Sequence, residues 1–416
     1  MAVCTPGDVP SVITRYLGFH CETANPVVTV RNPADLANWT LPVLEVTIIL
    51  GAVLALVHAI RRLRRDGDAT NLAVWIASLV YLFVIEPPLY FPNWFHAEEA
   101  MGFMFSHNVF TVNLMFDRLP LYIVAFYPAL SQLAYEIVRA WGFFDGSKRS
   151  ALRGSLVVAL VFQAFYEIFD QLGPQLKWWA WNLDAPFYSE TVRQLQAQGA
   201  HVDKLGNAAA EPTLASVPWG SVWLFATVSF AVLIYLAVRL VRNPTAEGRA
   251  PRGGSLVWRI IVAGVVAVIS MPLLSIPTAI FGRDENANRD AQTIVYWIEM
   301  LLVWGIGLAL LYAQWRRLRA QPETAASDAG TALPFLIVFP PLFLAVHLVL
   351  WLTALPAFLA AKDGVTADNT PTGSLPYVIV CFVVATSVLV EAIMRARRAA
   401  RPDVPRPVTD SRSAAG

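Results

Sequence analysis

Five acidic residues lie inside long apolar runs of the chain or at the ends of such runs: Glu45, Glu86, Glu167, Asp170 and Glu299. An ionisable side chain costs about 2.5–3.5 kcal/mol to insert into a membrane span, so residues of this kind usually have a function. A carboxyl that is buried without a cationic partner favours its neutral form, and a neutral carboxyl can act as a general acid. We expect the five carboxyls to surround one cavity in the outer half of the membrane and to catalyse a proton transfer. The alternative is that each carboxyl only joins neighbouring helices through hydrogen bonds.

Side chains in the segments next to these runs are candidates for substrate contacts. They are His96, His107, Asp117, Arg118, Trp178, Trp179 and Trp181. Tryptophan also anchors helix ends at the membrane surface, which is the alternative for the last three. A metal site built from His96, His107 and the acidic residues matches no ligand spacing, so we expect no metal. The chain has no P-loop, GxGxxG, GxSxG or HExxH motif, so we expect no cofactor.

The composition shows which elements must hold these residues. Of 416 residues, 56% are hydrophobic and 15% are charged, whereas soluble domains carry about 25% charged residues. A membrane-spanning helix needs about 20 mostly apolar residues, and backbone groups inside lipid must be paired within the segment, which excludes open strands. Nine runs meet this requirement: Trp39–Ile60, Leu72–Tyr90, Leu119–Val138, Ser155–Phe169, Val217–Val238, Leu256–Phe281, Gln292–Trp315, Ala332–Ala360 and Pro376–Met394. The fold class is therefore an all-α polytopic membrane protein, a bundle of about nine transmembrane helices.

Two of these runs are irregular. The fourth is short unless it begins near Ala151. The eighth contains Pro340, Pro341 and Pro356, and we expect it to be kinked or broken because proline removes a backbone donor and clashes with the preceding turn.

Arginine and lysine are concentrated in the segments that follow the odd-numbered runs. The positive-inside rule makes those segments cytoplasmic. It places the N-terminus outside and the C-terminus inside, in what we expect to be a bacterial cytoplasmic membrane. The net charge of +1 gives no reason to expect nucleic acid as a partner. The expected partners are membrane lipids, and the sequence defines no oligomeric state.

This topology divides the chain into three parts. They are an extracytoplasmic segment 1–38, a helical bundle 39–394 and a disordered, basic cytoplasmic tail 395–416. Two long outer loops, 91–118 and 170–216, are expected to fold back over the outer face of the bundle. Cys4 and Cys21 lie in the N-terminal segment and could form a disulfide, while Cys381 lies within an apolar run as a small core residue.

Three segments resemble the membrane-bound carotenoid hydratase family of bacterioruberin-type pathways. The first, Arg118–Leu130, is an apolar and aromatic helix containing Tyr-Pro-Ala. The second, Glu167–Trp181, is similar to the acidic helix end and Trp-x-Trp element of that family. The third, Val217–Trp223, resembles a helix that begins at proline and carries a tryptophan soon afterwards. The match covers about residues 75–240, and Ser221 stands where the family usually has Asn.

The resemblance implies that the chain adds water across a double bond of an isoprenoid substrate. A carboxylic acid would protonate the alkene, and aromatic faces would stabilise the carbocation that develops. Glu167 and Asp170, followed by Trp178, Trp179 and Trp181, supply both kinds of group. Two other functions stay open: a transporter that uses Glu45 and Glu299 for protons or cations, and a scaffold subunit without catalytic activity.

Overall fold

The computed structural model describes residues 3–97, 103–182, 189–199, 212–242, 251–282, 286–320 and 329–400. Within these ranges, nine helices are long and apolar enough to cross a membrane. They are Thr40–Asp66, Thr70–Tyr90, Leu121–Ala140, Lys148–Asp170, Gly220–Arg242, Gly254–Ala279, Arg289–Ala320, Ala329–Leu359 and Leu375–Ala399. The chain is therefore a multi-pass integral membrane protein, as its apolar runs predict.

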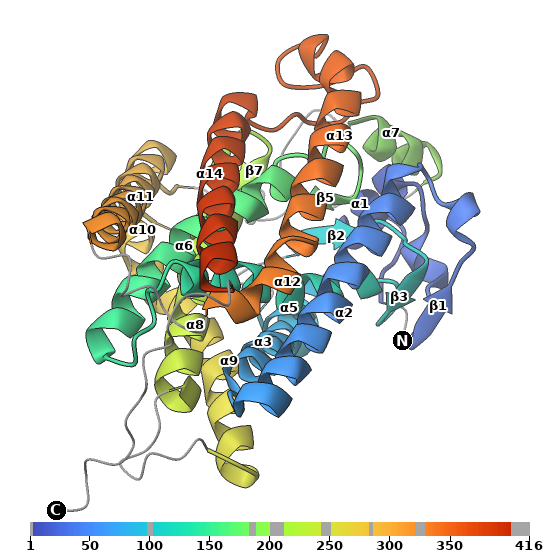
Figure 1. Ribbon diagram of the computed structural model, residues 1–416. Helices are drawn as coiled ribbons and strands as arrows, with labels where there is room; N and C mark the ends of the chain where they lie inside the picture. The colour runs from blue at the N-terminus through green and yellow to red at the C-terminus, as the bar shows by residue number, and fades with distance from the viewer. Residues whose placement is uncertain are drawn as a thin grey trace, which may run out of the picture.

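Helices α5 (Leu121–Ala140) and α6 (Lys148–Asp170) form the centre of the bundle (Figure 1). Helix α5 packs against α2 (Thr40–Asp66) and α3 (Thr70–Tyr90). Helix α6 packs against α8 (Phe230–Ala237), α11 (Arg289–Ala320) and α14 (Leu375–Ala399). The side chains of α5 and α6 are nearly all buried, so these two helices provide the interior positions where polar groups can be held.

Several helices have local features that explain where they begin or break. Helix α6 begins earlier than the apolar run because Ser147 accepts a hydrogen bond from the Ser150 amide over 3.1 Å. The fifth span is not a regular α-helix, because π-helical turns η6 (Gly220–Ser229) and η7 (Val238–Arg242) flank α8. The sixth span consists of α9 (Gly254–Leu274) and the short α10 (Ile276–Ala279).

The expected interruption of the eighth span is present. The span starts with η9 (Ala329–Ala332) and the short helix α12 (Leu333–Leu336). Helix α13 (Phe339–Leu359) follows after Val338 and has Pro340 in its first turn. The proline pair therefore starts a new helix rather than kinking a continuous one.

One end of the bundle is covered by residues 3–38, 91–97, 103–120, 171–182, 189–199 and 212–219, which we call the cap. The cap contains short antiparallel strands as well as helices, which the all-α expectation did not include. Strand β3 (Val112–Leu114) lies between β1 (Val28–Val30) and β4 (Leu119–Pro120), with Thr29 opposite Asn113. Strand β2 (Phe105–His107) pairs with β5 (Trp179–Trp181), with Ser106 opposite Ala180, so the two long loops are joined to each other. Strands β6 (Thr213–Leu214) and β7 (Val217–Pro218) form a separate pair.

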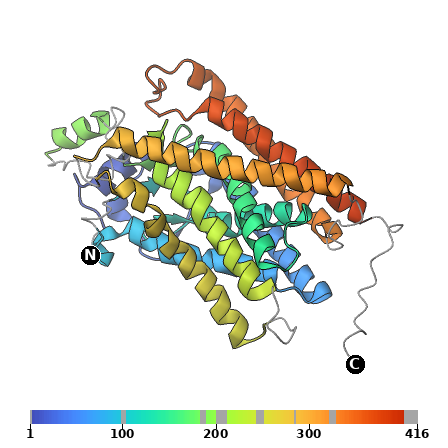
Figure 2. The same cartoon turned by 90° about the vertical axis from the view of Figure 1, so that its left-hand side faces the viewer.

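The remaining cap elements are short helices: α1 (Val9–Leu17), α7 (Ser189–Ala197), η1 (Cys21–Thr23), η2 (Pro33–Asp35) and η3 (Pro92–Phe95). Helix α1 contacts β2, β5 and α7. Figure 2 shows α1 and the last turns of α14 at opposite ends of the bundle.

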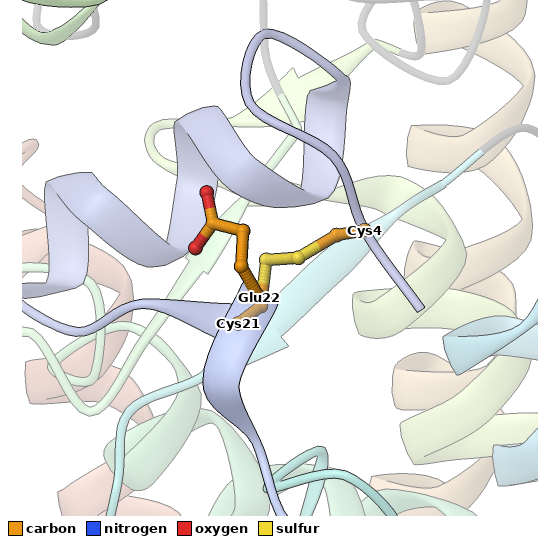
Figure 3. A group of neighbouring side chains, drawn as sticks. All are labelled: Cys4, Cys21 and Glu22. Carbon is orange, nitrogen blue, oxygen red and sulfur yellow. A yellow bond between two sulfur atoms is a disulfide. The ribbon is translucent and has the colours of Figure 1, made fainter. Parts of the chain in front are cut away.

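A disulfide closes the N-terminal part of the cap. Cys4 and Cys21 are bonded, with their Cα atoms 6.2 Å apart (Figure 3). Among the described residues, Cys4, Cys21 and Glu22 are the one group with the spacing of metal ligands, but both sulfurs are used in the disulfide. Glu22 instead accepts hydrogen bonds from Ser11 over 2.9 Å and Arg15 over 3.0 Å, both on α1.

The opposite end of the bundle carries a buried network around Glu136. One oxygen of this carboxylate pairs with Arg139 over 2.6 Å, and the other lies 3.3 Å from His58 and 2.5 Å from Asn71. Arg139 also donates to Thr331 over 3.2 Å. Glu136 and Arg139 thus pair along α5, and the network additionally joins α5 to α2, α3 and η9.

The chain near its C-terminus differs from expectation. Helix α14 continues to Ala399, so residues 395–399 are helical and not part of a disordered tail. Arg395 pairs with Glu391 over 2.6 Å and lies over the Trp141 ring at 5.0 Å. These contacts stabilise the last turns of the helix. The rest of the expected tail, 401–416, lies outside the described residues.

Candidate functional site

A cavity of about 660 Å³ lies at the cap end of the bundle. Its walls come from the ends of α3, α5 and α6 nearest the cap, from η6, and from α9, α10 and α11. Strands β2 and β5 of the cap also contribute to the lining. The volume is within the range of about 300–1,000 Å³ that is typical of pockets for small molecules.

The walls of the cavity are mostly apolar and unusually aromatic. Phe126 and Phe169 face each other from α5 and α6, with ring centroids 4.6 Å apart. Trp179 lies 4.8 Å from the Phe169 ring, and Phe225 lies 5.2 Å from Tyr166. All five residues line the cavity. Aromatic faces carry negative electrostatic potential and attract cations, so this lining can accommodate both hydrophobic and cationic groups.

Asp170 is the last residue of α6 and lines the cavity. Its Oδ2 atom accepts a hydrogen bond from the Ser221 hydroxyl over 2.7 Å, and Ser221 lies 3.0 Å from the Tyr166 hydroxyl. The Tyr166 hydroxyl also interacts with the Asp170 carboxyl directly. The π-helical segment η6 is fixed beside α6 because Gln163 donates to the Val222 carbonyl over 3.0 Å. The Asp170 carboxyl is therefore held in place by neighbouring hydroxyl groups.

Glu86 approaches the same cavity from the last turns of α3. Its Oε1 atom accepts a hydrogen bond from the Tyr127 hydroxyl on α5, and the Tyr90 hydroxyl of α3 also interacts with this carboxyl. Pro87 and Pro88 follow, and α3 ends at Tyr90. Glu86 and Asp170 thus share one arrangement: neighbouring hydroxyl groups hold each carboxyl in place.

Neither carboxyl is neutralised by a cation. In the part of the chain that the structure describes, Glu86 and Asp170 form no ion pair with Lys, Arg or His. Both side chains are buried, with 4% and 0% of their surface exposed. Two buried carboxyls without a cationic partner among these residues therefore line one largely apolar space.

The other three predicted carboxyls do not line this cavity, so the expectation that all five surround one space is wrong. Glu45 accepts hydrogen bonds from the Thr111 and Val112 amides over 3.2 and 3.3 Å, which fixes β3 of the cap to α2. Glu299 lies on α11 beside Trp223.

Glu167 is buried on α6, where its Oε2 atom accepts from Gln171 over 3.1 Å. Its neighbours include Tyr377 and Cys381 of α14. The i, i+3 spacing with Asp170 does not make the two carboxyls face the same space, because different helices pack against them: α14 covers Glu167 and η6 covers Asp170.

The residues proposed for substrate contacts also separate into two groups. His107, Trp179 and Trp181 line the cavity. His107 is fully covered by β5 and neighbouring rings, and its Nδ1 atom lies 3.2 Å from the Tyr122 hydroxyl. Burial lowers the pKa of His107 to about 3, so the imidazole is neutral near pH 7.

The remaining four do not line the cavity. Trp178 is buried and donates to the Thr40 hydroxyl over 2.9 Å. Asp117 pairs with Arg31 through two contacts of 2.8 and 3.1 Å. Arg118 is buried beneath the cap, where it donates to Ser106 over 3.3 Å, and burial lowers its pKa to about 10. His96 is exposed at the end of η3.

Several lining residues were not predicted from the sequence. Tyr127 and Tyr166 hold the two acids directly or through Ser221, and Phe126 and Phe225 form aromatic walls. A signal for the tyrosines was present, because a phenol inside an apolar span needs a hydrogen-bond partner. The phenylalanines gave no such signal, since they are ordinary residues of a membrane helix.

No family model matches the chain, and no match was found among curated proteins or among solved structures. The functional conclusion therefore depends on the chemistry and geometry of this cavity.

Proposed function

We propose that this membrane protein is an enzyme that adds water to a carbon–carbon double bond of an isoprenoid or similar unsaturated lipid. The observation that supports this proposal is that Glu86 and Asp170, from different helices, both line one apolar and aromatic cavity. A cavity for a polar substrate would carry more hydrogen-bonding groups, and no cation in the described ranges neutralises either carboxyl.

The proposed reaction begins with proton transfer from one carboxyl to the alkene. We assign this step to Asp170, because Phe169 and Trp179 lie beside it and can stabilise a cation. The π electrons of the double bond form the new C–H bond, and the other carbon becomes a carbocation. Protonation by a positioned acid contributes about 10²–10⁴-fold to the rate of such steps.

The second step uses water as the nucleophile. The water oxygen forms the C–O bond with the carbocation, and the Glu86 carboxylate accepts the proton that water releases. Proton exchange between the two carboxyls then restores the starting state, so no cofactor is consumed. Tyr127 and Ser221 position the acids in this scheme and do not themselves react.

The position of the cavity supports an enzyme over a transporter. All lining residues belong to the half of the bundle nearest the cap. The buried Glu136 network lies at the other end, and none of its residues lines the cavity. A transporter would need a polar path that reaches both membrane faces. A scaffold would not need an open space with two unpaired acids.

We also propose that the cap lies on the extracytoplasmic side of a bacterial cytoplasmic membrane. Arg62, Arg139, Arg242 and Arg395 are all at the end opposite the cap, which is the cytoplasmic end under the positive-inside rule. The Cys4–Cys21 disulfide in the cap is consistent with an oxidising compartment.

Lipid analysis of cells tests the proposed function. Lipids from cells that contain the protein, lack it, or contain the Glu86→Gln and Asp170→Asn double variant are compared by mass spectrometry. The proposal predicts a lipid heavier by one water molecule that appears only with the active protein. An isoprenoid profile that is the same in all three would contradict it.

A further inference from the structure

The cavity reaches the lipid-facing surface of the bundle between α3 and α9. Val84 on α3 and Ile269 on α9 both line the cavity, yet 37% and 52% of their surfaces are exposed. Pro272, which also lines the cavity, is exposed on the same side of α9. A residue that both lines a cavity and faces the outside marks a place where the cavity opens.

The packing of α3 against α9 explains why the opening is at this level. Further from the cap, Gly264 of α9 lies so close to α3 that a Cβ atom would be 2.7 Å from the Ala77 carbonyl oxygen and 2.8 Å from Val80. This close approach closes the interface at Gly264. Towards the cap, α9 ends at Leu274 after Pro272, and α10 begins separately at Ile276. The opening between α3 and α9 therefore lies between the tight helix crossing at Gly264 and the helix break between α9 and α10.

The surface around the opening is apolar. Exposed neighbours on α3, α9 and α10 are Phe83, Leu273, Leu274 and Ile276, with exposed fractions from 42% to 60%. These residues belong to spans that lie in the membrane, so the opening meets hydrocarbon and not water. An ion or a sugar would lose its hydrogen bonds to water on passing through such a surface, which is costly. A hydrocarbon chain would not.

We propose that this opening is a lateral portal through which a lipid chain passes from the bilayer into the cavity. The inference rests on the proposed function and adds how the substrate is selected. The double bond to be hydrated lies near the end of the chain that enters, beside Glu86 and Asp170. The rest of a long chain stays in the bilayer, because a cavity of about 660 Å³ encloses a molecule of drug size. The substrate class is thus an unsaturated lipid whose reactive double bond lies in the part of the chain that enters the cavity.

Photolabelling in vesicles tests the portal. The protein is reconstituted in phosphatidylcholine and exposed to geranylgeraniol that carries a diazirine on its terminal isoprene unit. Peptides containing Val84 or Ile269 should be labelled. Replacing Ile269 by Trp should reduce labelling of the cavity residues by about tenfold, a factor that corresponds to 1.4 kcal/mol.

Ile261→Trp is the matched control. Ile261 lies on the same helix and is 47% exposed, but it does not line the cavity, so this variant should be labelled like the wild type. Ile269→Ala covers the case in which the Trp variant does not fold, since it widens the portal and should increase labelling. Equal labelling of wild type, Ile269→Trp and Ile269→Ala would overturn the portal.

The portal and the proposed chemistry fail separately in this experiment, because labelling needs no turnover. The Asp170→Asn variant should be labelled like the wild type. If labelling depends on Ile269 but no lipid is hydrated, the portal stands and the hydratase proposal is wrong. If a lipid is hydrated but labelling does not depend on Ile269, the hydratase proposal stands and the portal is wrong.

Discussion

The Ser221 hydroxyl donates a hydrogen bond to Asp170 over 2.7 Å and so joins the start of η6 to the end of α6. The two residues are far apart in the sequence and come from spans of different geometry, one π-helical and one α-helical. This contact fixes one oxygen of Asp170. The position of the proposed acid therefore depends on how the fifth span packs against the fourth.

Asp170 and Glu167 provide a direct comparison of two buried acids on one helix. Asp170→Asn should lower the hydration rate by about 10²–10⁴-fold, because an amide cannot donate the proton. Glu167→Gln should stay within a few-fold of wild type, since Glu167 does not line the cavity. The measurement is product formation per folded protein in vesicles. A greater loss with Glu167→Gln than with Asp170→Asn would place the chemistry beside α14 instead.

Much of this arrangement follows from the sequence, and some does not. The spans are predictable because lipid requires long apolar helices, and Glu86 and Asp170 are conspicuous because charge is costly there. Their partners are not predictable. Sequence spacing gives the angle between Glu167 and Asp170 around α6. It does not show which helix covers each residue, because that depends on packing between segments far apart in the sequence.

Glu45 illustrates a second limit of sequence analysis. It is a lone acid in an apolar run, which is the same signal that Glu86 gives. In the structure it binds two backbone amides of the cap, a use that depends on where the loop containing β3 folds. The short cap strands were also not foreseen, because each spans only two or three residues and carries no recognisable alternation.

Close helix packing at Gly51 should make this position sensitive to a single methyl group. A Cβ atom there would overlap the Phe339 ring, which is buried between Phe335 and Phe343 and has no room to move. We expect Gly51→Ala to destabilise the protein by about 1–3 kcal/mol. Gly305→Ala is the control, because nothing lies within 4 Å of its Cβ position. Thermal unfolding in detergent compares the two, and equal midpoints would argue against this packing of α2 on α13.

Burial of His107 should make the cap end sensitive to acid. Its pKa is lowered to about 3 from an ordinary value of 6.5 because burial disfavours the charged imidazole. Between these values the unfolded chain binds more protons than the folded one. Stability should therefore fall by about 1.4 kcal/mol for each unit of pH below 6.5, down to about pH 3.

Replacement of His107 tests this dependence. His107→Gln should flatten the change of the unfolding midpoint between pH 6.5 and 4, because the titrating group is gone. Tyr122→Phe removes the hydroxyl that lies 3.2 Å from the imidazole but leaves the His107 ring buried. The unfolding midpoint of this variant should therefore change with pH as in the wild type. Identical slopes for His107→Gln and wild type would show that His107 does not control acid stability.

The cap should also depend on its disulfide. The bond between Cys4 and Cys21 has a sequence separation of 17, and closing a loop of that size contributes about 3 kcal/mol. The Cys4→Ser and Cys21→Ser double variant should therefore unfold in the cap at lower denaturant concentration, as measured by limited proteolysis of α1. Thiol counting checks the bond itself: denatured protein should show Cys381 alone before reduction and all three cysteines after it. Three thiols before reduction would rule out the disulfide.

The most direct test of the catalytic proposal is isotope transfer from water. Purified protein in vesicles is incubated in ¹⁸O-labelled water with a terminally unsaturated isoprenoid lipid, and the lipids are analysed by mass spectrometry. The proposal predicts a product that carries one ¹⁸O-labelled hydroxyl with the wild type and with Glu167→Gln, and none with Glu86→Gln or Asp170→Asn. Labelled product at the wild-type level from both cavity variants would contradict the role of this carboxyl pair.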